Sequence, residues 1–308
     1  MDLSVVIPLY NEEGSLRELN EKLTKVLAKL NLSYEILYID DGSRDKSAEI
    51  LNEIATQDQH VRLIAHKRNF GKSTALAVAF SKVNGKLVIT MDADLQDDPE
   101  EIPRFIEYIN TGYDLVSGWK QNRQDPFVKV LSSKIFNFTV AFLSGLKIHD
   151  FNCGFKIYRQ TVVKNIEVYG ELHRFLPFLA HQQGFKVGEI KIKHHARQFG
   201  ESKYGHLGLR RLSNYILDPI NVVFITRYQK KPAHFFGNLG LISFALGILI
   251  SLYLTVLWFM GEGIGNRPLL FLGILLIIIG IQLVSMGFLG ELIVKENLSK
   301  DKDEYIKK

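Results

Sequence analysis

Residues 87–96 read LVITMDADLQ, an apolar run that ends in two aspartates one residue apart. The run has the length of a strand and is rich in branched apolar side chains, so it predicts a buried strand over residues 87–91. Two earlier stretches repeat this pattern, LSVVIPLYNEE over residues 3–13 and YEILYIDDGS over residues 34–43. We therefore expect a series of buried strands, each followed directly by polar residues.

Helix-like stretches with apolar residues at helical spacing separate these strands. The helices are expected over residues 15–30, 47–54 and 73–83, and a further strand over residues 61–65. Strands that alternate with helices predict an α/β fold, with a mainly parallel sheet covered on both faces. Ligands of such sheets bind beyond the carboxyl ends of the strands, so the polar residues there form the candidate site.

The candidate site is rich in carboxylates. Its acidic residues are Glu12, Glu13, Asp40, Asp41, Asp92 and Asp94. Gathered at one sheet edge they would repel one another, so a divalent cation or a donor-rich ligand is the natural partner. An isolated Asp-x-Asp pair is more often part of a solvated turn, but its place after a buried strand, with Gln96 close behind, favours a cation site. Mg²⁺ and Mn²⁺ both accept a few carboxylates together with phosphate oxygens.

A second loop, NFGKST over residues 69–74, resembles the end of a P-loop. The full motif requires a glycine five positions before Gly71, where this chain has His66, so the pattern fails. We expect this loop to cap the following helix and to bring Lys72 close to phosphate.

Composition divides the chain of 308 residues into three regions. The formal net charge of +5 is the balance of −7 over residues 1–118, +12 over residues 119–231 and zero over residues 232–308. An apolar content of 46% excludes intrinsic disorder, and a single cysteine, Cys153, excludes a disulfide framework and a cysteine-based metal site. We expect Cys153 to be a packed residue rather than a nucleophile.

The neutral third region contains two stretches without a charged residue, 235–260 and 268–290. Each is long enough to cross a bilayer, because a spanning helix needs about 20 apolar residues. The alternative is a pair of buried helices in a soluble protein, which is rarer for two such runs so close together. Basic residues flank the pair and outnumber the single Arg267 in the loop between them, so the positive-inside rule places both termini in the cytoplasm.

Residues 207–231 mix apolar side chains with arginines and lysines. They predict one or two amphipathic helices, broken at Pro219, that lie either on a membrane surface or against the soluble domain. The expected organisation is an α/β domain over residues 1–206, amphipathic juxtamembrane helices over 207–233, a transmembrane hairpin over 234–294 and a charged cytoplasmic tail over 295–308.

Several motifs together resemble those of one family. They are VVIPLYNE (5–12), DDGS (40–43), RNFGK (68–72) and DADLQDDPE (92–100), and the likeness continues through GWK (118–120), HDFNCGFK (149–156) and RQFGESKY (197–204). The set resembles family 2 glycosyltransferases with the GT-A fold. More narrowly, it resembles polyprenyl-phosphate glycosyltransferases, namely dolichol-phosphate mannose synthases and bacterial bactoprenol glucosyltransferases, and the likeness covers nearly the whole chain.

The resemblance implies a role for individual residues. Those that match nucleotide-binding positions are Pro8, Tyr10, Glu12 and Asp40, joined by Asp41. Those that match the metal and diphosphate site are Asp92, Ala93, Asp94 and Gln96, with Asp94 and Gln96 as the direct ligands of Mg²⁺ or Mn²⁺. Arg123 matches a basic residue near the phosphates, while Arg197, Ser202 and Lys203 match a loop that closes over donor and acceptor. Asp150 matches a position proposed as the catalytic base.

The chemistry of the implied reaction limits the role of Asp150. The second pKa of a lipid monophosphate is about 6, so the phosphate is mostly dianionic at neutral pH and is already a nucleophile. A strong general base is then less necessary, and Asp150 would instead orient a basic side chain or cap a turn. The candidate catalytic residues are Asp92, Asp94, Asp150, Arg123 and Lys203.

The implied activity is an inverting, metal-dependent transfer of a hexose, foremost glucose from UDP-glucose, to undecaprenyl or a related polyprenyl phosphate at the cytoplasmic face of the plasma membrane. The alternatives are another donor, GDP-mannose or a UDP-aminopentose, or a non-catalytic membrane scaffold that binds nucleotide or lipid. The +12 region would face anionic lipid and the acceptor phosphate, or form an ordinary solvated surface. Nucleic acid is not an expected partner, because the first region is acidic and two spans follow. Glycines in the spans permit close helix packing, and a homo-oligomer is expected.

Overall fold

The structure is a computed structural model, and it describes residues 1–121, 137, 140–141, 145–193, 195, 232–265 and 267–298. The chain forms two compact units, Met1–Val222 and Val223–Lys308. Each unit is described by itself below. The amphipathic helices expected over residues 207–233 lie outside the described residues, apart from the last two positions, which already belong to the first helix of the second unit.

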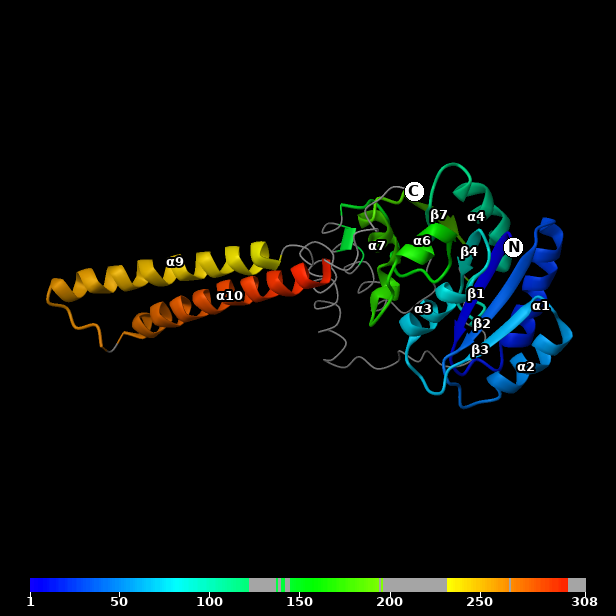
Figure 1. Ribbon diagram of the computed structural model, residues 1–308, viewed down its shortest axis with the longest axis horizontal. Helices are drawn as coiled ribbons and strands as arrows, with labels where there is room; N and C mark the ends of the chain where they lie inside the picture. Colours follow the sequence, from blue (N-terminus) through cyan, green and yellow to red (C-terminus); the bar gives the residue numbers. More distant parts are fainter. Residues whose placement is uncertain are drawn as a thin grey trace. The chain divides into compact units, whose positions relative to one another are not determined.

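The described part of the first unit contains one seven-stranded sheet with the order β3-β2-β1-β4-β6-β5-β7 (Figure 1). Its strands are β1 (Leu3–Leu9), β2 (Tyr34–Asp40), β3 (Val61–Ala65), β4 (Leu87–Thr90), β5 (Leu115–Lys120), β6 (Lys156–Arg159) and β7 (Val187–Ile192). Strands β1 to β4 pair in parallel and β5 pairs in parallel with β7, whereas β6 is antiparallel to both of its neighbours. The mainly parallel α/β sheet expected from the sequence is therefore confirmed.

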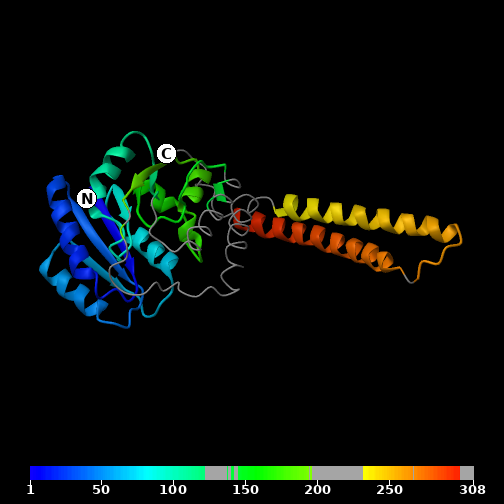
Figure 2. The same ribbon diagram turned by 180° about the vertical axis from the view of Figure 1, so that it is seen from behind.

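Helices cover both faces of this sheet, as Figures 1 and 2 show from opposite sides. The helices α1 (Leu16–Leu27), α2 (Ser47–Gln57) and α4 (Ile102–Ile109) pack on one face, and α3 (Lys72–Lys82), α6 (Gln160–Asn165) and α7 (Leu176–Gln182) pack on the other. Short 3₁₀ turns lie at η1 (Ala28–Leu30), η2 (Pro99–Glu101) and η3 (Leu172–Arg174). Two large hydrophobic clusters result, one on each side of the strands, and a smaller third cluster of the described residues forms around Phe151 and Phe175.

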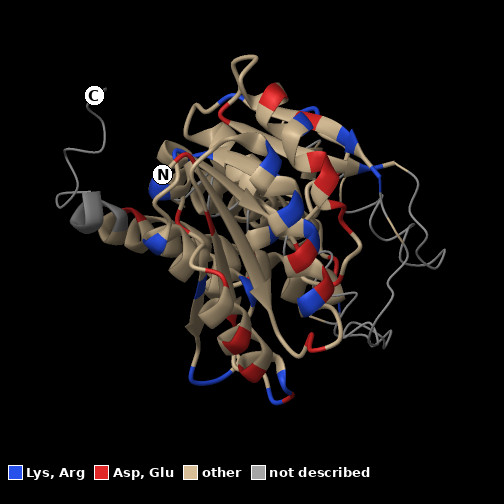
Figure 3. Cartoon of the chain, turned by 90° about the vertical axis from the view of Figure 1, so that its right-hand side faces the viewer, with Lys and Arg blue, Asp and Glu red and all other residues tan. Residues whose placement is uncertain are grey.

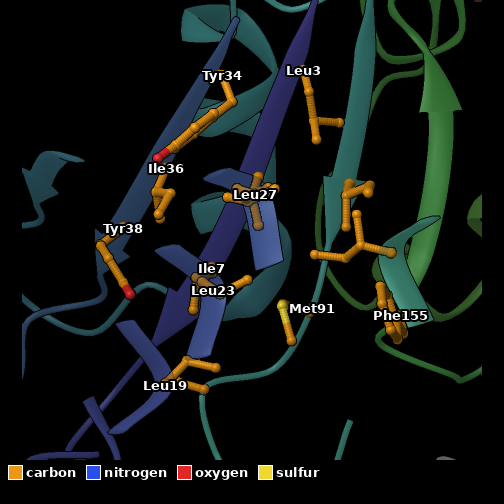
Figure 4. Packing of buried hydrophobic residues seen from close by; sticks show 14 of the residues in the cluster. Leu3, Ile7, Leu19, Leu23, Leu27, Tyr34, Ile36, Tyr38, Met91 and Phe155 are labelled. Atoms are coloured by element: carbon orange, nitrogen blue, oxygen red, sulfur yellow. The ribbon is translucent and has the colours of Figure 1, made fainter. Parts of the chain in front are cut away.

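Helix α1 shows how the sequence pattern produces this packing. Its leucines recur at helical spacing, and Leu19 and Leu23 are completely buried. Figure 4 shows Leu23 beside Ile7 of β1, and both leucines belong to the cluster that also contains Ile36 of β2. Burying each such side chain contributes roughly 1.5–3 kcal/mol, so this face of the helix, rather than its helical propensity, holds it on the sheet.

Charged residues of both signs are interspersed over the surface of the first unit (Figure 3), whereas strands β1 and β4 contain none. Lys129, Lys134, Arg210 and Arg211 of the +12 region lie outside the described residues. The basic face expected to meet lipid therefore stays a prediction.

The second unit contains two long apolar helices, α9 (Pro232–Phe259, 28 residues) and α10 (Pro268–Leu298, 31 residues). Both are long and apolar enough to cross a membrane, and most of their side chains face outward rather than into protein. A core helix of a soluble protein would be mostly buried, so this exposure favours the membrane hairpin over the alternative of two core helices.

Glycines line the contact between α9 and α10. A Cβ on Gly240 would lie 2.7 Å from the carbonyl oxygen of Gly280, and one on Gly247 would lie 2.7 Å from that of Gly273. These small residues let the two backbones approach within one chain. Packing between α9 and α10 of one chain therefore explains these glycines without a second protomer. The homo-oligomer expected from the sequence remains a prediction, and the glycines do not support it.

Candidate active site

The carboxyl ends of β1, β2 and β4 lie side by side, because β1 pairs in parallel with both other strands. Leu9 pairs with Asp40, and Val6 pairs with Thr90 two residues before Asp92. The polar segments that follow the three strands therefore start from one edge of the sheet. Strand order thus creates the concentration of carboxylates that the sequence pattern predicts.

The segments after β1 and β2 are tied to each other. The backbone amide of Asn11, which has φ +53°, donates to Ser43 Oγ at 2.9 Å, and that of Glu12 donates to Ser47 Oγ at 3.0 Å. Asp40 is buried and its carboxylate accepts the amide of Ser43 at 2.9 Å. Of the residues expected to hold the nucleotide, Pro8 is buried, while Tyr10 and Glu12 are half-buried on this segment. These contacts keep the expected base and ribose region rigid.

Asp41 holds a loop in place. Its carboxylate accepts the backbone amides of Phe70 at 2.9 Å and Gly71 at 2.8 Å, and it lies 2.8 Å from His66 Nδ1. The side chain is almost fully buried. Asp41 therefore positions the loop that leads into α3, and its expected contact with the nucleotide stays a prediction.

Three lysines from different elements surround Asp92. Lys72, the first residue of α3, forms an ion pair with the Asp92 carboxylate. Lys120 at the end of β5 pairs with the buried Asp97 at 2.8 Å, and the buried Lys156 of β6 contacts the carbonyl oxygen of Cys153. Burial acts to raise the pKa of Asp92, but the charges of Lys72 and Lys120 outweigh it and lower that pKa to about 2.

Asp94 has the opposite electrostatic character. Burial, followed by repulsion from Asp92 and Asp97, raises the pKa of Asp94 to about 6. Its carboxylate accepts the backbone amide of Gln96 at 3.2 Å across Leu95, which has φ +60°. A non-glycine residue in the left-handed region costs of order 1 kcal/mol, so the turn that presents Asp94 and Gln96 is held under strain.

The donors after β4 fit a cation that arrives with phosphate. Asp92, Asp94 and Gln96 offer hard oxygen ligands, which suit Mg²⁺ and Mn²⁺. Within the described residues, no three His, Cys, Asp or Glu side chains form a group that could hold a metal ion. The arrangement therefore suits an ion held by one or two carboxylates and by the phosphates of a ligand, rather than a metal caged by protein alone.

The raised pKa of Asp94 predicts a pH-dependent cost to stability. Between about pH 4 and pH 6 the folded chain holds a proton on Asp94 that the unfolded chain, with the ordinary value of 3.8, has lost. The free energy of unfolding therefore falls as the pH rises through this window, and the loss reaches its full size above about pH 7. We expect Asp94→Asn to raise the melting temperature of the metal-free protein at pH 7.5 by about 2–4 °C.

The gain should shrink as the pH is lowered toward about 4.5, because Asp94 of the parent protein then becomes protonated without charge repulsion. Differential scanning fluorimetry of the detergent-purified chain at several pH values measures this difference. A gain that is constant with pH would contradict the assignment of the raised pKa to Asp94.

A recess with an empty volume of about 270 Å³, including its open mouth, lies beside Asp92. It is lined by Pro8, Lys72, Leu76, Thr90, Met91, Asp92, Cys153, Gly154, Lys156, Tyr158, His173 and Leu176. His173 Nδ1 lies 2.9 Å from Ser73 Oγ, and burial, with the charge of Lys72 next, holds the pKa of His173 well below its usual range. His173 is therefore neutral and acts as a hydrogen-bonding group here.

Asp150 is buried and caps a turn. Its carboxylate accepts the amide of Asn152 at 3.2 Å, and its carbonyl oxygen accepts the hydroxyl of Ser117 at 3.3 Å. These contacts match the turn-capping alternative for this residue. Cys153 is buried as expected, and burial raises the pKa of its thiol to about 12, which leaves it unreactive at neutral pH.

Four predicted site residues, Arg123, Arg197, Ser202 and Lys203, lie outside the described residues. Strand β7 ends at Ile192, and beyond it the backbone amide of His195 donates to the Gln96 carbonyl at 3.0 Å. The chain that leads toward Arg197 therefore starts beside the Asp-x-Asp segment.

Sequence reasoning did not place Lys120, Lys156, His173 or Gly154 beside Asp92, and it expected Lys156 on the basic face toward lipid and acceptor phosphate, whereas Lys156 is buried. Gly154 permits the position of Asp92, because a Cβ on Gly154 would lie 2.7 Å from the Asp92 Cγ. The motif GWK contains Lys120, and the motif HDFNCGFK contains Gly154 and Lys156. Lysines that directly follow apolar residues in these motifs were the sequence signal that could have indicated a site contact. No local pattern marks His173.

A mainly parallel sheet with an acidic motif at its carboxyl edge is typical of an α/β transferase domain of the GT-A type, here followed by two apolar helices long enough to cross a membrane. Residues 4–167 match the family model of Glycosyl transferase family 2, and the chain belongs to this family. It is therefore a glycosyltransferase.

Curated relatives match over nearly the whole chain. A dodecaprenyl-phosphate galacturonate synthase of Rhizobium johnstonii is 37% identical over 303 residues, which cover 96% of this chain and 88% of the relative. An undecaprenyl-phosphate 4-deoxy-4-formamido-L-arabinose transferase of Photorhabdus laumondii is 38% identical, covering 94% and 88% of the two chains. Both relatives are named as polyprenyl-phosphate sugar transferases.

Among solved structures, the glucosyl-3-phosphoglycerate synthase of Mycobacterium tuberculosis, in complex with Mn²⁺, UDP and phosphoglyceric acid, aligns with a TM-score of 0.55. The alignment covers 73% of this chain and 78% of that one at 18% identity. At this identity the likeness establishes the fold alone.

Proposed function

We propose that this chain transfers a sugar from a nucleoside diphosphate sugar to a polyprenyl phosphate at a membrane surface. The observation that carries the proposal is the combination, in one chain, of the acidic site after β4 with an apolar hairpin of spanning length. The two relatives match nearly the whole of this chain, including the acidic motif and the apolar helices. Their names support a polyprenyl phosphate as the acceptor.

The proposed reaction is a single displacement. A phosphate oxygen of the acceptor forms a bond to the anomeric carbon, while the bond from that carbon to the β-phosphate oxygen breaks and the nucleoside diphosphate leaves. A single displacement inverts the anomeric configuration. A divalent cation held by Asp92, Asp94 and Gln96 would neutralise the charge that builds up on the leaving diphosphate.

The residues of the chain have separate roles in this scheme. The tied segments after β1 and β2 hold the nucleoside, and Asp41 holds the loop that presents Lys72 to the phosphates. Because the acceptor is already anionic, no proton has to leave it during attack. Asp150 therefore acts through the turn that it caps, and we do not assign it the role of a base.

For the donor, we propose a UDP-linked sugar. The motif resemblance points to glucose, whereas the relatives are named for galacturonate and for 4-deoxy-4-formamido-L-arabinose. The formamido arabinose belongs to the aminopentose class, which the sequence analysis names as an alternative donor to glucose. We therefore place a uronic acid or a formamido pentose ahead of glucose, and GDP-mannose last.

We further propose that α9 and α10 anchor the chain in the plasma membrane with both termini and the catalytic domain in the cytoplasm. Arg267 and Glu262 form an ion pair in the short loop between the helices, which leaves little net charge to be translocated. The flanking lysines stay on the opposite side, as the positive-inside rule requires. Accessibility of cysteines introduced near Arg267 and near the C-terminus to a membrane-impermeant reagent tests this orientation.

A donor panel tests the activity. Membranes that contain the full chain would receive polyprenyl phosphate and one radiolabelled donor, chosen from UDP-galacturonate, UDP-4-deoxy-4-formamido-L-arabinose, UDP-glucose and GDP-mannose. We expect label in the lipid extract from one of the first two donors, and none from membranes with the Asp94→Ala chain. Nucleotide binding without transfer from any donor would instead favour the non-catalytic scaffold.

A further inference from the structure

The ion pair between Lys72 and Asp92 occupies the first carboxylate of the Asp-x-Asp motif. Lys72 reaches it from the start of α3, and Asp92 follows β4. The two side chains are 29% and 31% exposed, so the pair lies where a ligand can reach it. The contact is made by Asp92 Oδ1, and carboxylate oxygens are also the ligands that a hard divalent cation would take.

Asp92 lies close to the segment that leads into β6. Gly154 lies directly against its carboxylate, with only the space that the absence of a side chain provides. Thr90, two residues earlier, donates its hydroxyl to the Gly154 carbonyl at 2.9 Å and ties β4 to the same segment. A second cation that approaches Asp92 therefore meets the ammonium of Lys72 at the same carboxylate, and like charges so close together repel strongly.

Lys72, in contrast, has the means to move. Its four-carbon stem is flexible and carries a compact ammonium with three donors. The loop before it is held by Asp41 through the amides of Phe70 and Gly71, so the side chain can swing without displacing the backbone.

We propose that Lys72 is a placeholder cation, which occupies Asp92 in the ligand-free enzyme and moves to the donor diphosphate when a divalent cation binds. The identity of the diphosphate rests on the proposed function, whereas the competition at Asp92 does not. Lys72 thereby acts twice, first by neutralising Asp92 before the cation binds and then by binding the leaving group.

The proposal makes two opposite predictions for Lys72→Met. Without nucleotide, the variant should bind Mn²⁺ about five- to tenfold more tightly than the parent, because no ion pair has to be broken. With saturating Mn²⁺, it should bind UDP about tenfold more weakly, because the diphosphate loses a charged partner. A residue that only stabilises the fold would not move these two affinities in opposite directions.

The experiment uses the full chain in detergent. Electron paramagnetic resonance of free Mn²⁺ measures metal binding, and calorimetry measures UDP binding. Lys67→Met is the matched control, because Lys67 is an exposed lysine of the same loop, and we expect both of its affinities to stay within twofold of the parent. Circular dichroism and the melting temperature confirm that each variant is folded.

A double-mutant cycle separates competition at Asp92 from a general change of charge. If Lys72 competes for Asp92, Lys72→Met should change Mn²⁺ affinity less than twofold in the Asp92→Asn background. An equal gain in both backgrounds, or Mn²⁺ affinity of Lys72→Met equal to or below that of the parent, would overturn the proposal. The Mn²⁺ measurements need no sugar donor, so absence of transfer activity would overturn the proposed function and leave this test intact.

Discussion

Asp94→Ala is expected to lower turnover by at least about three orders of magnitude, because a cation on a leaving diphosphate supplies several kcal/mol of transition-state stabilisation. Asp94 is the carboxylate of the motif whose pKa is raised to about 6, by burial first and then by Asp92 and Asp97. A divalent cation relieves that repulsion, whereas Asp92 is already neutralised by lysines. The measurement is label transfer to polyprenyl phosphate with saturating Mg²⁺ or Mn²⁺.

The fold should survive this change. Removal of Asp94 takes away a charge that the folded state holds at a cost, so the melting temperature should equal or exceed that of the parent at neutral pH. Glu107→Ala, which removes an exposed carboxylate from α4, is the control and should keep full activity. Full activity of Asp94→Ala in Mg²⁺ would show that the metal assignment is wrong.

Gly154→Ala should lower turnover by about 100-fold, although it adds only one methyl group, because a displacement of about 1 Å in a reactive site can have this effect. The new Cβ would lie 2.7 Å from Asp92 Cγ and 2.8 Å from its Oδ1, distances that real Cβ atoms do not show. Asp92 has to move, and its contact with Lys72 moves with it. Steady-state kinetics at saturating metal measure the loss.

Two comparisons identify the cause of that loss. Gly237→Ala is the matched control, because a Cβ on Gly237 meets nothing within 4 Å, and it should leave turnover unchanged. In an Asp92→Asn background, Gly154→Ala should add much less than 100-fold, because both changes act on the same carboxylate. Equal losses in both backgrounds would locate the effect of Gly154 elsewhere.

In the first unit, strands β1 to β4 and helices α1 to α3 were predictable because their signals are local, whereas β5 to β7 and the helices after β4 were not predicted. The strand over residues 61–65 was predicted with its observed bounds, and the helix expected over residues 15–30 comprises α1 and the 3₁₀ turn η1. Each apolar run or helical repeat reports the burial of one element and needs no knowledge of its neighbours. The two apolar helices of the second unit were predictable for the same reason.

Parts of the site could also be predicted from the sequence. Parallel strands place their carboxyl ends at one edge, so Asp40 and Asp92 could be assigned to the same region before any coordinates. Their partners could not be assigned in this way. Asp41 binds backbone amides of the loop before α3, and Asp150 caps a turn, because these contacts depend on loop geometry that carries no periodic signal.

The sequence by itself therefore determined the α/β class, the acidic edge and the apolar hairpin, because each depends on side chains close together along the chain. Only the tertiary structure decided how Asp92 is held. Strand β6 inserts antiparallel between β4 and β5, and this brings Gly154 and Lys156 beside a motif more than sixty residues earlier. Contacts between such distant segments depend on strand order and on the space between side chains, which no local pattern encodes.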